Sequence, residues 1–192
     1  MDEGHEDSTP HGRQEIDAEP VAGRSLADAL LEGPLATDDV VELGAELADA
    51  LARIHDRGGV HGGVEPAGVL FADDGLPHLA DVGSAHLADS AAYMAPEQVR
   101  GEDVGAPADV YSLGLVLLEA LTGRREYPGP TAEAAVARVR RPPRVPAGLP
   151  ASIAGALGAM TATDPAARPT AAEVVAMLQA PTLVLPARRR PV

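Results

Sequence analysis

The glycine-rich stretch VHGGVEPAGVL, residues 60–70, begins like a catalytic loop. It holds no residue suited to chemistry at the places where such a loop would need one. Gly63 and Gly68 stand at positions where a catalytic loop would be expected to carry reactive side chains. The stretch therefore has the outline of an active-site loop but holds few groups that can react.

A zinc site is one alternative for this region. Four histidines lie in and around the stretch: His55, His61, His78 and His86. Asp81 is also near in sequence and could join them as a ligand. Their spacings match no standard zinc-ligand pattern, and the absence of Cys excludes Cys-ligated zinc, thiol nucleophiles and disulfides. We expect a packing role for His61 and no zinc. Asp81 alone is a poor magnesium site, because Mg²⁺ is usually held by carboxylates together with substrate phosphates.

The tripeptide HGG, residues 61–63, also resembles the oxyanion-hole loop of lipases and esterases. Such enzymes require a G-x-S-x-G nucleophile elbow. No serine of the chain lies in such a sequence: the serines examined are Ser25, Ser84, Ser90, Ser112 and Ser152. We therefore set this interpretation aside.

Composition limits the possible partners. The formal net charge is −14, all 15 basic residues are Arg, and the chain has no Lys, so nucleic acid is not an expected partner. The longest apolar run, residues 113–121, is interrupted by Glu119 and is shorter than the ~20 residues that span a bilayer. Residues 1–20 are acidic, fit no signal or transit peptide, and are expected to be disordered. We expect a soluble, cytoplasmic protein without a membrane span.

The elements that must position the loop are mainly helical. Ser25 is a predicted N-cap of a short helix that ends at Gly33–Pro34, and Thr37 is the predicted cap of the next helix. That second helix carries apolar residues at spacings of 3 or 4: Val40, Leu43, Leu47, Leu51 and Ile54. Residues 69–71 and 76–80 are predicted to pair as a small hairpin through Asp74–Gly75.

The second half of the chain is predicted to be helical throughout. Residues 110–121 are apolar on nearly all sides, which indicates a helix buried in the middle of the domain and closed by Gly123. Three further helices are expected at 131–141, 151–160 and 170–178, the last with a capping box of Thr170 and Glu173. The Pro- and Arg-rich residues 181–192 are interpreted as a tail.

Taken in order, these features resemble the C-terminal lobe of bacterial serine/threonine protein kinases, from about residue 19 to 180. The family signatures are H-R-D-x-K-P-x-N, D-F-G and A-P-E. They stand here as HGGVEPAG (61–68), DVG (81–83) and APE (95–97), with DVYSLG and ARPT further along. Five motifs in family order make the resemblance specific. It implies a mainly α, kinase-like C-lobe with one small hairpin.

The resemblance also implies that the chemical positions are lost. In the family the loop Asp accepts the substrate proton, the loop Lys stabilises the transferring phosphoryl group, and the Asn holds a metal ion. Gly63, Glu65 and Gly68 occupy those three positions. Leu70 and Asp81 match residual nucleotide- and metal-binding positions. We expect no cofactor, with ATP and Mg²⁺ only as residual binding.

Other matching positions are structural. His61, Asp109, Glu97 and Arg168 match residues that hold the lobe together. We predict that Asp109 accepts backbone N–H groups of the loop and that Glu97 and Arg168 form a largely buried ion pair. Ser90 matches a hydroxyl that contacts the loop Asp, and it is expected to be solvated because that position is now Gly63.

The function implied is that of a truncated, catalytically inactive domain at residues 21–180, acting as a binding or regulatory module. The N-lobe, with its Gly-rich strand and its Lys, is expected to be absent. The exposed hinge side is expected to mediate self-association or partner binding through Val21, Leu26, Leu70 and Val82. Alternatives are a residual phosphotransferase completed by a partner chain, or a decayed product. Four arginines form a cluster in sequence: Arg138, Arg140, Arg141 and Arg144. We expect them to be a solvated helix end and not a binding site for an acidic partner.

Overall fold

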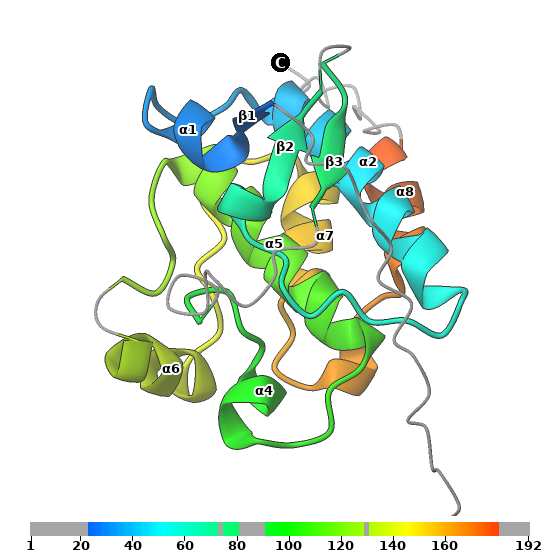
Figure 1. Ribbon diagram of the computed structural model, residues 1–192. Helices are drawn as coiled ribbons and strands as arrows, with labels where there is room; N and C mark the ends of the chain where they lie inside the picture. Colours follow the sequence, from blue (N-terminus) through cyan, green and yellow to red (C-terminus); the bar gives the residue numbers. More distant parts are fainter. Residues whose placement is uncertain (1–22, 73–74, 81–90, 129–130, 181–192) are drawn as a thin grey trace, which may run out of the picture.

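A computed structural model describes residues 23–72, 75–80, 91–128 and 131–180, without the side chains of 131 and 132. The fold is mainly α-helical with one small antiparallel sheet (Figure 1), which confirms the predicted fold class. The segments interpreted as an acidic head, 1–20, and a tail, 181–192, lie outside the described residues.

The sheet has three strands: β1 (Arg24–Ser25), β2 (Val69–Phe71) and β3 (Pro77–Leu79), in the order β1-β2-β3. The predicted hairpin is β2–β3, with Leu70 paired to His78. β1 adds an antiparallel edge to β2, with Ser25 opposite Leu70. A two-residue strand is too short to show the alternation that sequence patterns depend on, so β1 was not predicted.

Helix α1 (Leu26–Leu30) begins at the predicted cap: the Ser25 hydroxyl accepts from the Asp28 N–H at 3.1 Å. The expectation that Leu26 faces outward is wrong, because its side chain is 0% exposed. The short helix folds back over β2 and the 3₁₀ turn η1 (Pro66–Gly68), which buries its first residue. Leu70 is half-buried, whereas Val21 and Val82 lie outside the described residues.

Helix α2 (Thr37–His55) shows the predicted apolar face. Four of the residues at the predicted spacings are buried: Val40, Leu43, Leu47 and Leu51. The fifth, Ile54, is only partly buried. Its N-cap is Ala36, not Thr37, and no side chain caps it. Asp38 and Asp39 instead place negative charge in the first turn, where the helix dipole favours it.

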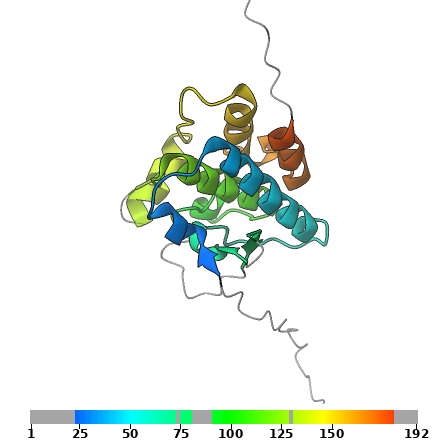
Figure 2. The same cartoon turned by 90° about the horizontal axis from the view of Figure 1, so that it is seen from above.

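Helix α5 (Ala106–Thr122) is the predicted buried helix, with every residue from Ala108 to Leu118 buried. It ends at Gly123, whose φ of 68° is left-handed and therefore suits glycine. Helices α7 (Ala151–Met160) and α8 (Ala171–Gln179) pack on α5 and α2 respectively. Figure 2 shows the small sheet on the side of the α2–α5 layer opposite α7 and α8.

Two peripheral helices complete the described fold, α4 (Pro96–Arg100) and α6 (Thr131–Arg140). The expectation that Arg138 of α6 is solvated is wrong, because it is 1% exposed. Its Nη2 donates to the Ala92 carbonyl at 2.8 Å, and its Nη1 donates to the Met94 carbonyl. Since a charged side chain is buried only when its donors are paired, these carbonyls explain its position.

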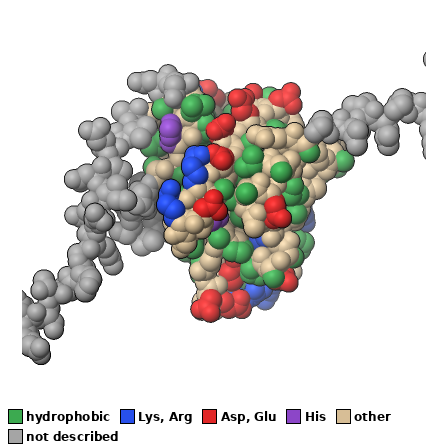
Figure 3. All heavy atoms as spheres, turned by 90° about the vertical axis from the view of Figure 1, so that its right-hand side faces the viewer, with side chains coloured by type: hydrophobic (Ala, Val, Ile, Leu, Met, Phe, Trp, Pro, Cys, Tyr) green, Lys and Arg blue, Asp and Glu red, His purple; other side chains and the backbone are tan. Residues whose placement is uncertain are grey.

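The face formed at the right of Figure 1 carries acidic and hydrophobic side chains intermixed, with a few arginines (Figure 3). Within the described ranges, no helix is both long enough and apolar enough to cross a membrane.

Candidate functional site

The glycine-rich loop is anchored by Asp109 in the first turn of α5. Its Oδ2 accepts the His61 N–H at 2.8 Å, and its Oδ1 accepts the Gly62 N–H at 2.7 Å. The carboxylate is only 1% exposed, so these amides compensate for the loss of water. The predicted contact between Asp109 and the loop is therefore present.

His55, the last residue of α2, is a third partner of this carboxylate. Its Nε2 lies 2.8 Å from Asp109 Oδ2, and its side chain is 12% exposed. The sequence analysis considered His55 only as a possible metal ligand. Its place at the end of the helix that leads into the loop was the signal for a structural role, since α2 must pack against α5 there.

His61 is half-buried and turned back on its own loop. Its Nδ1 accepts the Gly63 N–H at 3.3 Å, whereas its Nε2 is buried without a hydrogen-bond partner. Among the residues that the structure describes, no group of three or more His, Asp or Glu side chains is placed to hold a metal ion. His86 and Asp81 lie outside the described residues, so the magnesium position implied for Asp81 stays a prediction.

Gly63 occupies the position of the catalytic base in the family signature. A Cβ atom placed there would meet nothing within 4 Å. Packing around a Cβ atom therefore does not require a glycine at this position. Gly62 differs, because its φ of 74° is a conformation that favours glycine.

Gly68 closes the loop at the end of η1. Its N–H donates to the Glu65 carbonyl at 3.0 Å, and its carbonyl accepts the Ala80 N–H at 2.8 Å. The second bond ties the loop to the residue immediately before Asp81. The backbone thus keeps the arrangement of a closed loop, although Gly68 brings no side chain that binds a metal.

Glu65, at the position of the family's loop Lys, is 1% exposed. Neither of its carboxylate oxygens has a hydrogen-bond partner among the residues described here. Glu65 lines a cavity of about 300 Å³ together with Leu30 of α1, Glu119 of α5, Arg125 after α5, and Tyr93, which lies just before α4. A buried carboxylate without a partner is costly, so this position is electrostatically unsatisfied in the isolated chain.

A second carboxylate lines the same cavity. Tyr93 donates its hydroxyl proton to Glu119 Oε2 at 2.5 Å. Burial raises the pKa of the Glu119 carboxyl, and it also raises the pKa of Tyr93. The sequence analysis noted Glu119 only as an interruption of an apolar run; a charged residue within an otherwise buried helix was the signal that it faces a polar site.

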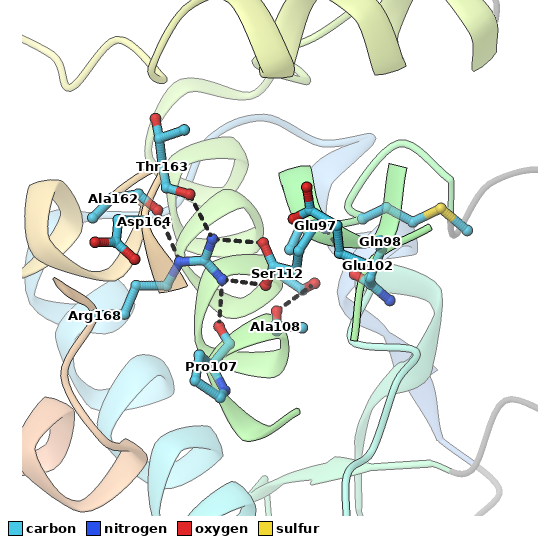
Figure 4. Close-up of polar contacts among 12 residues, drawn as sticks. Glu97, Gln98, Glu102, Pro107, Ala108, Ser112, Ala162, Thr163, Asp164 and Arg168 are labelled. Atoms are coloured by element: carbon cyan, nitrogen blue, oxygen red, sulfur yellow. Dashed lines mark hydrogen bonds and ion pairs between the residues drawn. The ribbon is translucent and has the colours of Figure 1, made fainter. Parts of the chain in front are cut away.

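The predicted ion pair between Glu97 and Arg168 is present and bidentate. Arg168 Nη1 lies 2.6 Å from Glu97 Oε1, and its Nη2 lies 2.8 Å from Oε2. Figure 4 shows the guanidinium group between this carboxylate and three backbone carbonyls, those of Pro107, Ala162 and Thr163. The pair links α4 to the segment before α8, and all donors of the guanidinium group are directed to acceptors.

The fold and the site together define a class of protein. The helical lobe, the loop held by Asp109 and the Glu97–Arg168 pair are arranged as the kinase signatures imply. The family model described as protein kinase domain matches residues 12–178. The chain belongs to the protein kinase domain family.

The chain is similar in sequence to bacterial serine/threonine kinases. It is 36% identical over 192 residues to the probable serine/threonine-protein kinase PkwA of Thermomonospora curvata, covering 88% of this chain and 26% of that protein. It is 37% identical over 160 residues to PknK of Mycobacterium tuberculosis H37Rv, covering 74% and 14%. With PknB of Mycolicibacterium smegmatis the identity is 35%, covering 90% and 31%. The chain thus spans less than a third of the length of each of these relatives.

Proposed function

We propose that this chain is a catalytically inactive member of the protein kinase family that works as a binding or regulatory module. The observation that carries the proposal is the buried, unpartnered carboxylate of Glu65 at the position of the loop Lys. A negative charge there opposes the negative phosphate groups that the lysine of an active kinase attracts.

The other loop positions support the same conclusion. Gly63 offers no group to accept a proton, although a Cβ atom would meet nothing within 4 Å there. Gly68 has no side chain to ligate a metal ion. A magnesium nucleotide needs both positive charge and metal ligands around its phosphates. The loop residues described therefore do not fit a bound magnesium nucleotide, and we expect neither a cofactor nor a phosphorylated product.

In a binding role, the cavity beside Glu65 would be part of the surface that contacts the partner. The cavity is bordered by Leu30 of α1 and by Leu31, the residue after it, which is 87% exposed. We infer that a protein partner covers this apolar edge and brings a basic group to Glu65. With no Cys and no membrane-spanning helix in the described part of the chain, we expect the partner to be met in the cytoplasm.

The direct test is phosphotransfer. Purified chain is incubated with labelled ATP, Mg²⁺ or Mn²⁺ and generic protein substrates, beside an Asp81→Ala variant that lacks the matching metal position. We expect the two proteins to give the same background incorporation. Incorporation by the wild-type chain above that of Asp81→Ala would support a residual phosphotransferase in place of the inactive module.

A further inference from the structure

A second pocket, of about 420 Å³, lies where α5 and α6 end. Four arginines line it, Arg124, Arg125, Arg141 and Arg144, with one carboxylate, that of Glu126. The pocket is therefore strongly cationic in a chain whose formal net charge is −14. Arg125 also lines the cavity beside Glu65, but the other three arginines have no role in the loop site described above.

One wall of the pocket is fixed by hydrogen bonds. Glu126 accepts from Arg141 Nη1 and from the Arg144 backbone N–H at 3.1 Å. The Arg141 guanidinium carbon lies 4.7 Å from the centroid of the buried Tyr127 ring, and the Tyr127 hydroxyl donates to the Arg141 carbonyl at 2.9 Å. The one carboxylate is thus already occupied by the Arg141 side chain and the Arg144 backbone.

Two of the other arginines are available to a ligand. Arg124 and Arg144 are exposed, and within the described residues no hydrogen bond or ion pair holds either guanidinium group. Beside them the pocket is lined by the apolar side chains of Pro128, Val145 and Pro146. The site therefore combines free guanidinium groups with an apolar surface next to them.

We propose that this pocket binds a phosphate group carried on a protein segment. Guanidinium groups recognise phosphate through paired, charge-assisted N–H···O bonds, which are stronger than neutral hydrogen bonds. The pocket is much larger than a phosphate ion, and its prolines and valine offer contacts to residues that flank a phosphorylated side chain. The strongly negative charge of the whole chain disfavours long polyanions such as nucleic acid, but it acts much less on one locally bound phosphate.

The test is titration of the full chain with a fluorescent peptide that carries one phosphoserine between neutral and apolar residues. The same peptide with serine, and inorganic phosphate as a competitor, are measured in parallel. The informative variant is Arg124→Gln/Arg144→Gln, since both side chains are exposed and neither touches the core. The matched control is Arg57→Gln, which is exposed just beyond α2, near the opposite end of α5.

We expect the phosphopeptide to bind to the wild-type chain and the serine peptide to bind at least about tenfold more weakly. The double variant should lose about tenfold or more in affinity for the phosphopeptide, because it lacks the charge-assisted bonds. The control should bind as the wild type does. Equal binding of both peptides, equal loss in Arg57→Gln, or inorganic phosphate that binds as tightly as the phosphopeptide would each overturn the proposal. The proposed lack of phosphotransfer does not enter this test, so the two proposals can fail separately.

Discussion

At the scale of single residues, the Glu97–Arg168 pair offers the clearest test of the scaffold. Arg168→Leu leaves the carboxylate of Glu97 buried without its partner, so we expect a loss of about 3 to 5 kcal/mol in the free energy of unfolding. Urea denaturation measures it. The exposed Arg140 provides the control, because Arg140→Leu should change stability by less than about 0.5 kcal/mol. Equal stability of the two variants would contradict a buried pair.

Replacement of Glu65 should increase the stability of the chain, whereas replacement of Arg168 should decrease it. Because its carboxylate is buried without a partner, Glu65→Met should raise the free energy of unfolding by about 1 to 3 kcal/mol. Glu46→Met on the exposed face of α2 controls for a general effect of added apolar surface. A less stable Glu65→Met variant would mean that the carboxylate contributes to the fold, and the argument for a partner at this position would lose its basis.

Glu119 predicts a specific dependence of stability on pH. Its pKa is raised from the usual 4.5 by burial, so the folded state favours the protonated carboxyl. The stability it contributes is fully present below about pH 4.5 and is lost as the pH rises through the raised value. Glu119→Gln keeps an acceptor for Tyr93 but does not titrate. The stability of the wild type relative to this variant should therefore fall as the pH rises above about 4.5, as thermal melts can show; a rise would contradict it.

At the scale of the elements, close helix packing depends on glycine. A Cβ on Gly114 of α5 would lie 2.7 Å from the Thr161 methyl and 3.2 Å from the Met160 Cβ, whereas a Cβ on Gly158 of α7 would meet nothing within 4 Å. We expect Gly114→Ala to destabilise the chain by about 1 to 3 kcal/mol through overpacking. Gly158→Ala should stabilise it by about 0.5 to 1 kcal/mol. Chemical denaturation compares them, and the same sign for both would contradict the packing described.

The elements also show what sequence patterns can and cannot predict. The faces of α2 and α5 followed from apolar spacing, and the caps at Ser25 and Thr170 followed from local side-chain chemistry. The cap at Thr37 was wrong because Thr37 is already the first helical residue, and the N-cap residue Ala36 has no side chain that can accept a backbone N–H. The burial of Arg138 depends on carbonyls more than 40 residues away, which no local pattern contains.

The candidate site shows the same division. The contacts of Asp109 with the loop and of Glu97 with Arg168 were implied by the family resemblance. The unpartnered state of Glu65 and the cavity around it depend on how α1, Tyr93 and Glu119 come together in space, and the sequence analysis predicted none of this. The burial of Leu26, wrongly expected to be exposed, belongs to the same tertiary arrangement.

At the scale of the whole molecule, we propose that the helical lobe of a kinase is kept while its loop no longer suits a magnesium nucleotide. The helices, the Asp109 contacts and the Glu97–Arg168 pair are present, and Glu65 stands where the family signature has a Lys. The most direct measurement is isothermal titration of the chain with ATP in the presence of Mg²⁺. We predict no saturable binding. Saturable binding of MgATP by the wild-type chain would contradict the claim.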